Sequence, residues 1–125
     1  MRMMLKSKIH CARVTGLNID YEGSITIGRN LMEEADILVY EQVEVLNLNN
    51  GARFTTYAIS SKIESDQICL NGAAARLANK GDMIIILSYC QIEESEAVNF
   101  MPKLVYVDDK NNIVETKRAI EAMPF

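Results

Sequence analysis

The glycine–serine pair Gly23-Ser24 is the sequence feature best suited to carry out chemistry. A serine hydroxyl can attack the carbonyl of the preceding residue and convert the peptide bond into an ester. Glycine suits the preceding position because it has no Cβ and tolerates strained backbone angles. Elimination across the serine then releases Gly23 as a new carboxyl terminus, and hydrolysis of the resulting dehydroalanine leaves a pyruvoyl ketone. Most Gly-Ser pairs are ordinary turns, so the surrounding sequence must decide between the two interpretations.

Arg53 and Tyr57 carry side chains that could bind and protonate a substrate. The planar guanidinium of Arg53 can bind a carboxylate through two hydrogen bonds. The Tyr57 phenol can act as a general acid in a dry pocket. A solvated arginine at a strand end and a core tyrosine are the alternatives. Thr55 and Thr56 lie on opposite faces of the same predicted strand, and a threonine is also a β-branched residue that simply favours strands.

Two further groups of residues could contact an anionic substrate. Lys8 and His10 share one face of a predicted strand, where Lys8 could hold a carboxylate and His10 could order the site. A lone histidine on a strand is more often structural. Asn71-Gly72 opens a short predicted helix whose first backbone N–H groups could bind an anion, although an ordinary Asn-Gly turn has the same sequence.

Short strands separated by turns must position these residues. The pattern predicts strands over residues 3–15, 25–27, 41–48, 54–59, 67–70, 83–87, 103–108 and 113–115, and a short helix over residues 73–77. Asn30 is expected to cap another short helix, with Glu33 three residues later. Asn49-Asn50-Gly51 predicts a hairpin turn because Asn and Gly tolerate positive φ. The run 83–87 is apolar throughout and predicts a strand buried on both faces.

Many short strands and the absence of a long helix predict a mainly β fold, a compact β-barrel with a few short helices. With 125 residues, the chain is expected to form one domain over residues 1–125. The net charge of −4 argues against nucleic-acid and anionic-membrane partners, which select for basic patches. The longest apolar run is far too short to span a bilayer.

Cysteine usage predicts reduced thiols in a cytoplasmic protein. The three cysteines, an odd number with no C-x-x-C pair, are Cys11, Cys69 and Cys90. A single histidine cannot complete a usual Cys/His zinc site, so no metal is expected. Charged and polar residues also interrupt the first ten residues, which argues against an apolar signal segment.

Five segments, in their order and spacing, resemble the pyruvoyl-dependent aspartate alpha-decarboxylases over residues 3–115. These segments are Lys8-Ile9-His10, Tyr21-Glu22-Gly23-Ser24, NGARFTTYAI at 50–59, Asn71-Gly72-Ala73-Ala74-Ala75 and Gly81-Asp82. The resemblance implies a closed double-psi β-barrel that forms a homotetramer, with active sites between neighbouring subunits. It also implies cleavage into residues 1–23 and 24–125, and conversion of L-aspartate into β-alanine and CO2 for pantothenate (coenzyme A) synthesis.

The resemblance also implies a role for each site residue. Ser24 becomes the pyruvoyl group, which forms an imine with the substrate amine and takes up the electrons left by CO2. Tyr57 is the proton donor, and Thr56 helps to polarise the Gly23 carbonyl during cleavage. The residues implied in substrate binding are Lys8, Arg53, Thr56, Asn71, Gly72, Ala73 and Ala74, with His10 and Tyr21 in supporting positions.

Some positions depart from the family pattern, and two other functions stay open. Many members have a basic residue at Cys11, some have an aromatic residue at Leu46, and the tail 116–125 lies beyond the resemblance. A non-catalytic β-barrel that binds a ligand or partner would predict an intact chain. A pyruvoyl decarboxylase of another amino acid is the second alternative, since Arg53 favours an acidic substrate without choosing aspartate over glutamate. An activating protein partner is also left open.

Overall fold

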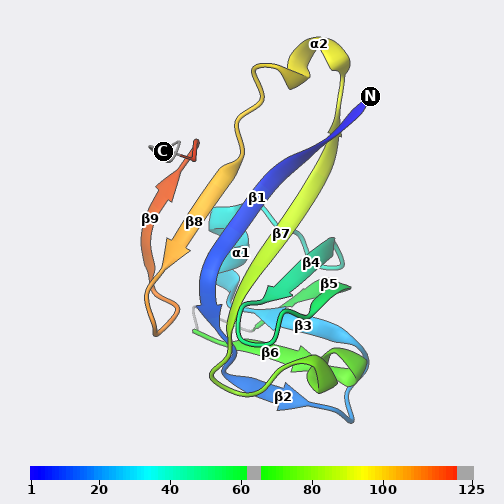
Figure 1. Cartoon of the computed structure of the whole chain (residues 1–125), viewed down its shortest axis with the longest axis vertical. Helices are drawn as coiled ribbons and strands as arrows, with labels where there is room; N and C mark the ends of the chain where they lie inside the picture. The colour runs from blue at the N-terminus through cyan, green and yellow to red at the C-terminus, as the bar shows by residue number, and fades with distance from the viewer. Residues whose placement is uncertain (62–65, 121–125) are drawn as a thin grey trace.

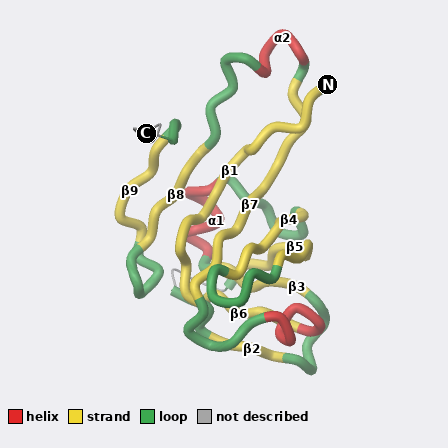
Figure 2. The backbone as a smooth tube through the Cα atoms, in the orientation of Figure 1, coloured by secondary structure: helices red, strands yellow, loops and turns green. Residues whose placement is uncertain are grey.

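The computed structural model describes residues 1–61 and 66–120, and its elements are mostly strands (Figures 1 and 2). The strands are β1 (Arg2–Arg13), β2 (Gly16–Asn18), β3 (Ser24–Ile27), β4 (Gln42–Asn47), β5 (Arg53–Ser60), β6 (Ile68–Asn71), β7 (Met83–Ile92), β8 (Lys103–Val107) and β9 (Ile113–Lys117). The helical segments in these residues are α1 (Arg29–Ala35), α2 (Glu94–Ala97) and the 3-10 helix η1 (Gly72–Leu77). The predicted mainly β class with short helices is therefore confirmed. No helix in the described ranges has the length and apolar character needed to cross a membrane.

The strands form one mixed sheet in the order β2-β6-β3-β5-β4-β7-β1-β8-β9. Figure 1 shows β1 and β7 running side by side as a long arm with α2 at its end, while β2 to β6 gather at the opposite end. Within that end, β3 pairs in parallel with β5 and antiparallel with β6. The strand that begins with Ser24 is therefore flanked by β5, which carries Arg53, Thr56 and Tyr57, and by β6, which ends at Asn71.

Alternation along β3 separates core residues from site residues. Ile25 and Ile27 are fully buried in the hydrophobic core, and Ser24 and Thr26 project from the opposite face of the strand. The same core holds Val43 of β4 and further apolar side chains of β1, β6 and β7. A packed core on one face thus fixes the register that presents Ser24 on the other face.

The predicted hairpin turn and most predicted strands are confirmed. The β4–β5 hairpin turns through Asn49, Asn50 and Gly51, and Gly51 has the expected positive φ of 76°. Asn111 also takes a positive φ, 61°, in the turn that joins β8 to β9. The predicted tail 116–125 begins inside β9, and its residues 121–125 lie outside the described residues. Closure of the sheet into a barrel stays a prediction.

Two local predictions were wrong. Asn30 does not cap α1, because Gly28 is the N-cap residue and its carbonyl already accepts a hydrogen bond from the Met32 N–H at 3.1 Å. The predicted strand at 83–87 extends to Ile92, and it is not buried on both faces. Ile84 and Ile86 are fully buried, whereas the alternate residue Ile85 is only half-buried.

Candidate active site

Ser24 lies at the start of β3 and is only 1% exposed, although Gly23 before it is exposed. The Asn71 Nδ2 group donates one hydrogen bond to Ser24 Oγ at 2.9 Å and another to Thr26 Oγ1 at 3.0 Å. The Ser24 hydroxyl faces the Glu22 carbonyl at 3.4 Å, which is long for an O–H···O bond. The serine oxygen is therefore fixed by a donor, and its own proton is only weakly engaged.

Strand register explains why Asn71 reaches both hydroxyls. Ser24 of β3 lies opposite Asn71 of β6 in the antiparallel ladder. Thr26 lies two residues further along β3 and so shares a face with Ser24. Asn71 is also the N-cap residue of η1, but its side chain makes no capping hydrogen bond. The amide is instead committed to the two β3 hydroxyls.

Gly72 brings the η1 backbone against the peptide that precedes Ser24. Its φ is +63°, and a Cβ built on it would lie 2.7 Å from Gly23 N, 2.8 Å from Gly23 Cα and 2.9 Å from the Tyr21 carbonyl oxygen. Atoms cannot approach so closely without a shift of backbone, so only glycine fits here. The predicted contact loop at Asn71-Gly72 therefore packs directly on the predicted cleavage peptide.

A pocket of about 340 Å³ opens beside Gly23. Its lining residues are Gly23, Phe54, Thr55, Thr56, Tyr57, Ala73, Ala74 and Leu77. It brings together the predicted cleavage glycine, the predicted proton donor Tyr57, Thr56 and the two alanines. Tyr57 keeps 36% of its surface exposed, so its ring is open to a molecule bound in the pocket. A concave, mostly apolar pocket with a few convergent polar groups is the usual form of a small-molecule site.

Arg53, Lys8 and His10 do not line this pocket within one chain. The Arg53 side chain is 64% exposed, and its Nη2 atom lies 2.9 Å from Oε1 of Glu44. Lys8 and His10 belong to β1, which is separated from β3 by β5, β4 and β7 in the sheet. The His10 ring packs on Tyr106 with ring centroids 5.3 Å apart. Burial, followed by the nearby Lys8 charge, holds the pKa of His10 below its usual value.

Tyr21 contributes to a different pocket, of about 270 Å³. That pocket is lined by Asn18, Tyr21, Thr26, Ile59, Ser60, Gln67, Cys69 and Asn71. Burial raises the pKa of the Cys69 thiol, whose sulfur lies 3.4 Å from Asn71 Oδ1. Asn71 is therefore shared between this pocket and the Ser24 environment.

Sequence reasoning missed Thr26, Phe54 and Leu77. Thr26 could have been found, because it lies two residues after Ser24 and must share its face of the strand. Phe54 and Leu77 carry no chemical signal, and only the packing of η1 near β5 places them at the pocket. In the described part of the chain, no group of three or more His, Cys, Asp or Glu residues could hold a metal ion.

A mainly β fold that holds a buried serine behind an exposed glycine, next to a pocket of small-molecule size, defines a candidate enzyme site. The aspartate decarboxylase family model matches residues 1–114, and the chain belongs to this family. It is 58% identical over 113 residues to an aspartate 1-decarboxylase of Thermoanaerobacter pseudethanolicus, covering 90% of this chain and 97% of the relative. Aspartate 1-decarboxylases of Hydrogenobaculum sp. (55% identity, 96% of this chain and 94% of the relative) and Dehalococcoides mccartyi (56%, 94% and 94%) are similar to it as well.

Proposed function

We propose that this chain is a self-processing, pyruvoyl-dependent enzyme that converts L-aspartate into β-alanine and CO2 for pantothenate synthesis. The observation that carries the proposal is the buried Ser24 hydroxyl, which Asn71 holds next to an exposed Gly23 at the edge of a pocket. Membership of the aspartate decarboxylase family, and relatives named aspartate 1-decarboxylase, support the substrate and the reaction.

Self-cleavage begins with the Ser24 hydroxyl. Its oxygen attacks the Gly23 carbonyl carbon, the Gly23–Ser24 C–N bond breaks, and the hydroxyl proton passes to the nitrogen, so that an ester joins the two residues. Loss of the Ser24 Cα proton together with the Cβ–Oγ bond releases Gly23 as a carboxylate and leaves dehydroalanine. Addition of water and loss of ammonia then give the ketone. Thr56 lines the same pocket as Gly23 and is the group proposed to polarise the Gly23 carbonyl.

The residues around position 24 fit a pyruvoyl group. Cleavage removes the Ser24 hydroxyl oxygen, so the Asn71 amide that binds it would be left as a free donor beside the ketone, at a position that is only 1% exposed. When formed, the pyruvoyl ketone supplies a carbonyl that condenses with the substrate amine and withdraws the electrons left by departing CO2. Tyr57 lines the pocket and is the group proposed to return a proton to carbon. Phe54 and Leu77 add apolar surface to the lining of the pocket.

Substrate binding by the remaining predicted residues requires a neighbouring copy of the chain. Arg53, Lys8 and His10 lie away from the pocket of their own chain. We therefore propose a homotetramer of closed double-psi barrels, in which these residues, with Tyr21 in a supporting position, approach the pocket of the next subunit. The exposed guanidinium of Arg53 would then exchange Glu44 for a substrate carboxylate. Cytoplasmic localisation is proposed because all three cysteines are free.

The experiment that tests this function compares the wild-type protein with Ser24→Ala. We expect the wild type to age into residues 1–23 and 24–125, the latter carrying a ketone in place of its first amine. Ser24→Ala should stay intact and form no β-alanine, because alanine has no hydroxyl to attack Gly23. Intact mass and β-alanine release are measured on one preparation, and light scattering gives its subunit number.

Each alternative predicts a different result in this experiment. A non-catalytic β-barrel would leave the wild type intact. A larger fragment that begins with serine would indicate ordinary proteolysis. Turnover of glutamate in preference to aspartate would identify another amino-acid decarboxylase. β-Alanine formed by Ser24→Ala would remove Ser24 as the source of the cofactor.

A further inference from the structure

We infer that the ion pair between Lys6 and Glu41 positions the ring of Tyr57, and that it acts through Tyr40. Lys6 and Glu41 are positioning residues, since neither lines the pocket beside Gly23. The inference deepens the proposed function, because it rests on Tyr57 as the proton donor. The contacts that carry it run from a bulge in β1 to the loop that joins α1 to β4, and from that loop to β5.

A β-bulge turns Lys6 out of the regular ladder of β1. Leu5 pairs with Tyr89 of β7, but Ser7 pairs with the adjacent residue Ser88, so Lys6 has no partner residue in this ladder. The two serine hydroxyls next to the bulge form a buried hydrogen bond at 2.7 Å. Bulges of this kind redirect a side chain. Here the Lys6 ammonium is aimed at the loop 36–41.

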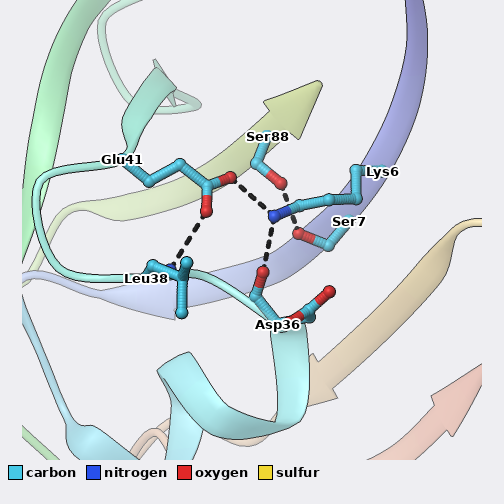
Figure 3. Close-up of polar contacts among 6 residues, drawn as sticks. All are labelled: Lys6, Ser7, Asp36, Leu38, Glu41 and Ser88. Atoms are coloured by element: carbon cyan, nitrogen blue, oxygen red, sulfur yellow. Dashed lines mark hydrogen bonds and ion pairs between the residues drawn. The ribbon is translucent and has the colours of Figure 1, made fainter. Parts of the chain in front are cut away.

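Lys6 binds both ends of that loop (Figure 3). Its Nζ atom donates to the Asp36 carbonyl oxygen at 2.5 Å and lies 2.7 Å from Oε2 of Glu41. The second carboxylate oxygen of Glu41 accepts a hydrogen bond from the Leu38 N–H at 3.0 Å. The Glu41 carboxylate is thus held by one charged and one backbone donor, and the loop between the two anchors is closed.

Burial distinguishes this ion pair from the surface pairs of the molecule. The Lys6 and Glu41 side chains are 20% and 21% exposed. The side chains of the Arg29–Glu33 pair on α1 are 62% and 70% exposed. Exposed pairs contribute little to structure because water and salt screen them, whereas partly buried pairs are screened much less. The Lys6–Glu41 pair is therefore suited to fix a loop in one conformation.

The closed loop is joined directly to the backbone around Tyr57. The Tyr40 N–H donates to the Ala58 carbonyl at 2.7 Å, and the Ala58 N–H donates to the Glu41 carbonyl at 2.9 Å. Ala58 follows Tyr57 in β5, and the Tyr40 and Tyr57 ring centroids are 6.3 Å apart with planes at 44°. This spacing lies within the range of favourable aromatic pairs. Tyr40 has a φ of 73°, so its backbone is held in a strained conformation by these contacts.

Packing must orient the Tyr57 ring. Among the described residues, none forms a hydrogen bond with the Tyr57 hydroxyl, and 36% of Tyr57 is exposed. Tyr40 is 77% exposed and contributes little to the core, and its ring contacts the Tyr57 ring. A small displacement of a proton donor lowers the rate of its step even where binding is unchanged. The ion pair is therefore expected to act on turnover more than on substrate affinity.

The test measures Lys6→Met, which keeps the length and apolar stem of the side chain but removes its charge. We expect normal cleavage at Gly23, an unchanged KM for aspartate, and a kcat per pyruvoyl group lowered about five- to tenfold. Tyr40→Ala should give a similar loss, and the double variant should lose no more than either single variant. Lys6→Arg should restore most of the rate. Arg29→Met, which breaks an exposed pair on α1, is the matched control and should behave as wild type.

A kcat of Lys6→Met or of Tyr40→Ala equal to that of wild type would overturn the inference, as would losses that multiply in the double variant. If Lys6→Met does not fold, the exposed Tyr40→Ala variant decides the question. The Tyr57 ring resonances provide a readout that needs no activity. They should shift in the same direction in both variants, and unshifted resonances would overturn the inference. A wild type that neither cleaves nor decarboxylates would contradict the proposed function but not this inference. The Tyr57 ring resonances would still test whether the Lys6–Glu41 ion pair positions the Tyr57 ring.

Discussion

At the scale of single residues, Asn71 makes the contact on which the proposed cleavage chemistry depends. Its amide is the donor that fixes the Ser24 oxygen, and its second hydrogen is held by Thr26. Because Thr26 fixes the orientation of the amide, Ser24 receives its hydrogen bond from a group that is already in place. Preorganised donors of this kind lose less order when the reaction begins.

Asn71→Ala should therefore lower the fraction of chains that acquire the pyruvoyl group. Loss of one hydrogen bond to a reacting group is worth about 0.5–1.5 kcal/mol, so we expect a reduction of up to about tenfold in the rate of formation. Thr26→Val removes only the second anchor of the amide and should have a smaller effect. The intact mass of the 24–125 fragment, followed over time, measures both variants. An Asn71→Ala protein that forms the ketone as fast as wild type would contradict this role.

Residue chemistry and the family resemblance together predicted part of the site. Thr56 and Tyr57 were expected at the site from their place in the family pattern, and the structure places both beside Gly23. Arg53 was expected to bind substrate from its chemistry, but its guanidinium pairs with Glu44, a contact that no sequence pattern shows. Thr26 was overlooked even though period-2 alternation from Ser24 predicts its face.

At the scale of elements, the approach of η1 to the β3 segment can be tested with a matched pair of glycines. Gly72→Ala should lower cleavage at Gly23 severely, because its Cβ would collide with Gly23 N at 2.7 Å and push this segment out of place. Gly51→Ala is the control, since Gly51 also has a positive φ, +76°, but faces open space. Both variants share a backbone cost of about 1–2 kcal/mol.

Thermal unfolding and the fraction cleaved separate the two effects. Similar losses of stability with cleavage impaired only in Gly72→Ala would support a steric role at the cleavage peptide. Equal cleavage in the two variants would show that the close approach of η1 to Gly23 is not required.

The presence of a strand or turn was easier to predict than its bulges and its exact ends. Asn-Gly turn residues predicted the hairpin after β4, and the alternation of apolar and polar residues predicted most strands, because both signals are local. The bulge at Lys6 was not predictable, since it arises where β1 must match β7 through a register shift. The start of α1 was misplaced because the Gly28 carbonyl, rather than the Asn30 side chain, begins its hydrogen bonding.

At the scale of the whole molecule, the sheet order keeps β1 and its polar residues apart from the Ser24 pocket. His10 is consequently in an environment set by long-range packing. The ring lies against Tyr106 of β8, its buried Nδ1 atom has no hydrogen-bond partner in the described part of the chain, and Lys8 lies on the same strand. The Lys117 ammonium lies over the ring of this same Tyr106, 5.3 Å from its centroid. Burial of the ring and the Lys8 charge disfavour a protonated imidazole.

Global stability should therefore fall as the pH drops below the ordinary pKa of histidine. The folded-state pKa of His10 is lowered from 6.5, first by burial and then by Lys8, so the unfolded chain binds more protons in this range. The stabilisation is complete above about pH 6.5 and is lost as the pH falls through the lowered folded-state value. Carboxylates such as Asp82, whose pKa is lowered by hydrogen bonds from Asn47 and Asn79, titrate at more acidic pH and do not obscure this window.

Denaturant unfolding of Ser24→Ala, which stays uncleaved, is compared with Ser24→Ala/His10→Phe between pH 7.5 and 5.5 at one protein concentration. The first protein should lose stability over this range and the second should lose less, because phenylalanine keeps the ring contact with Tyr106 but cannot be protonated. Parallel pH profiles for the two proteins would show that His10 does not contribute to the acid sensitivity of the fold.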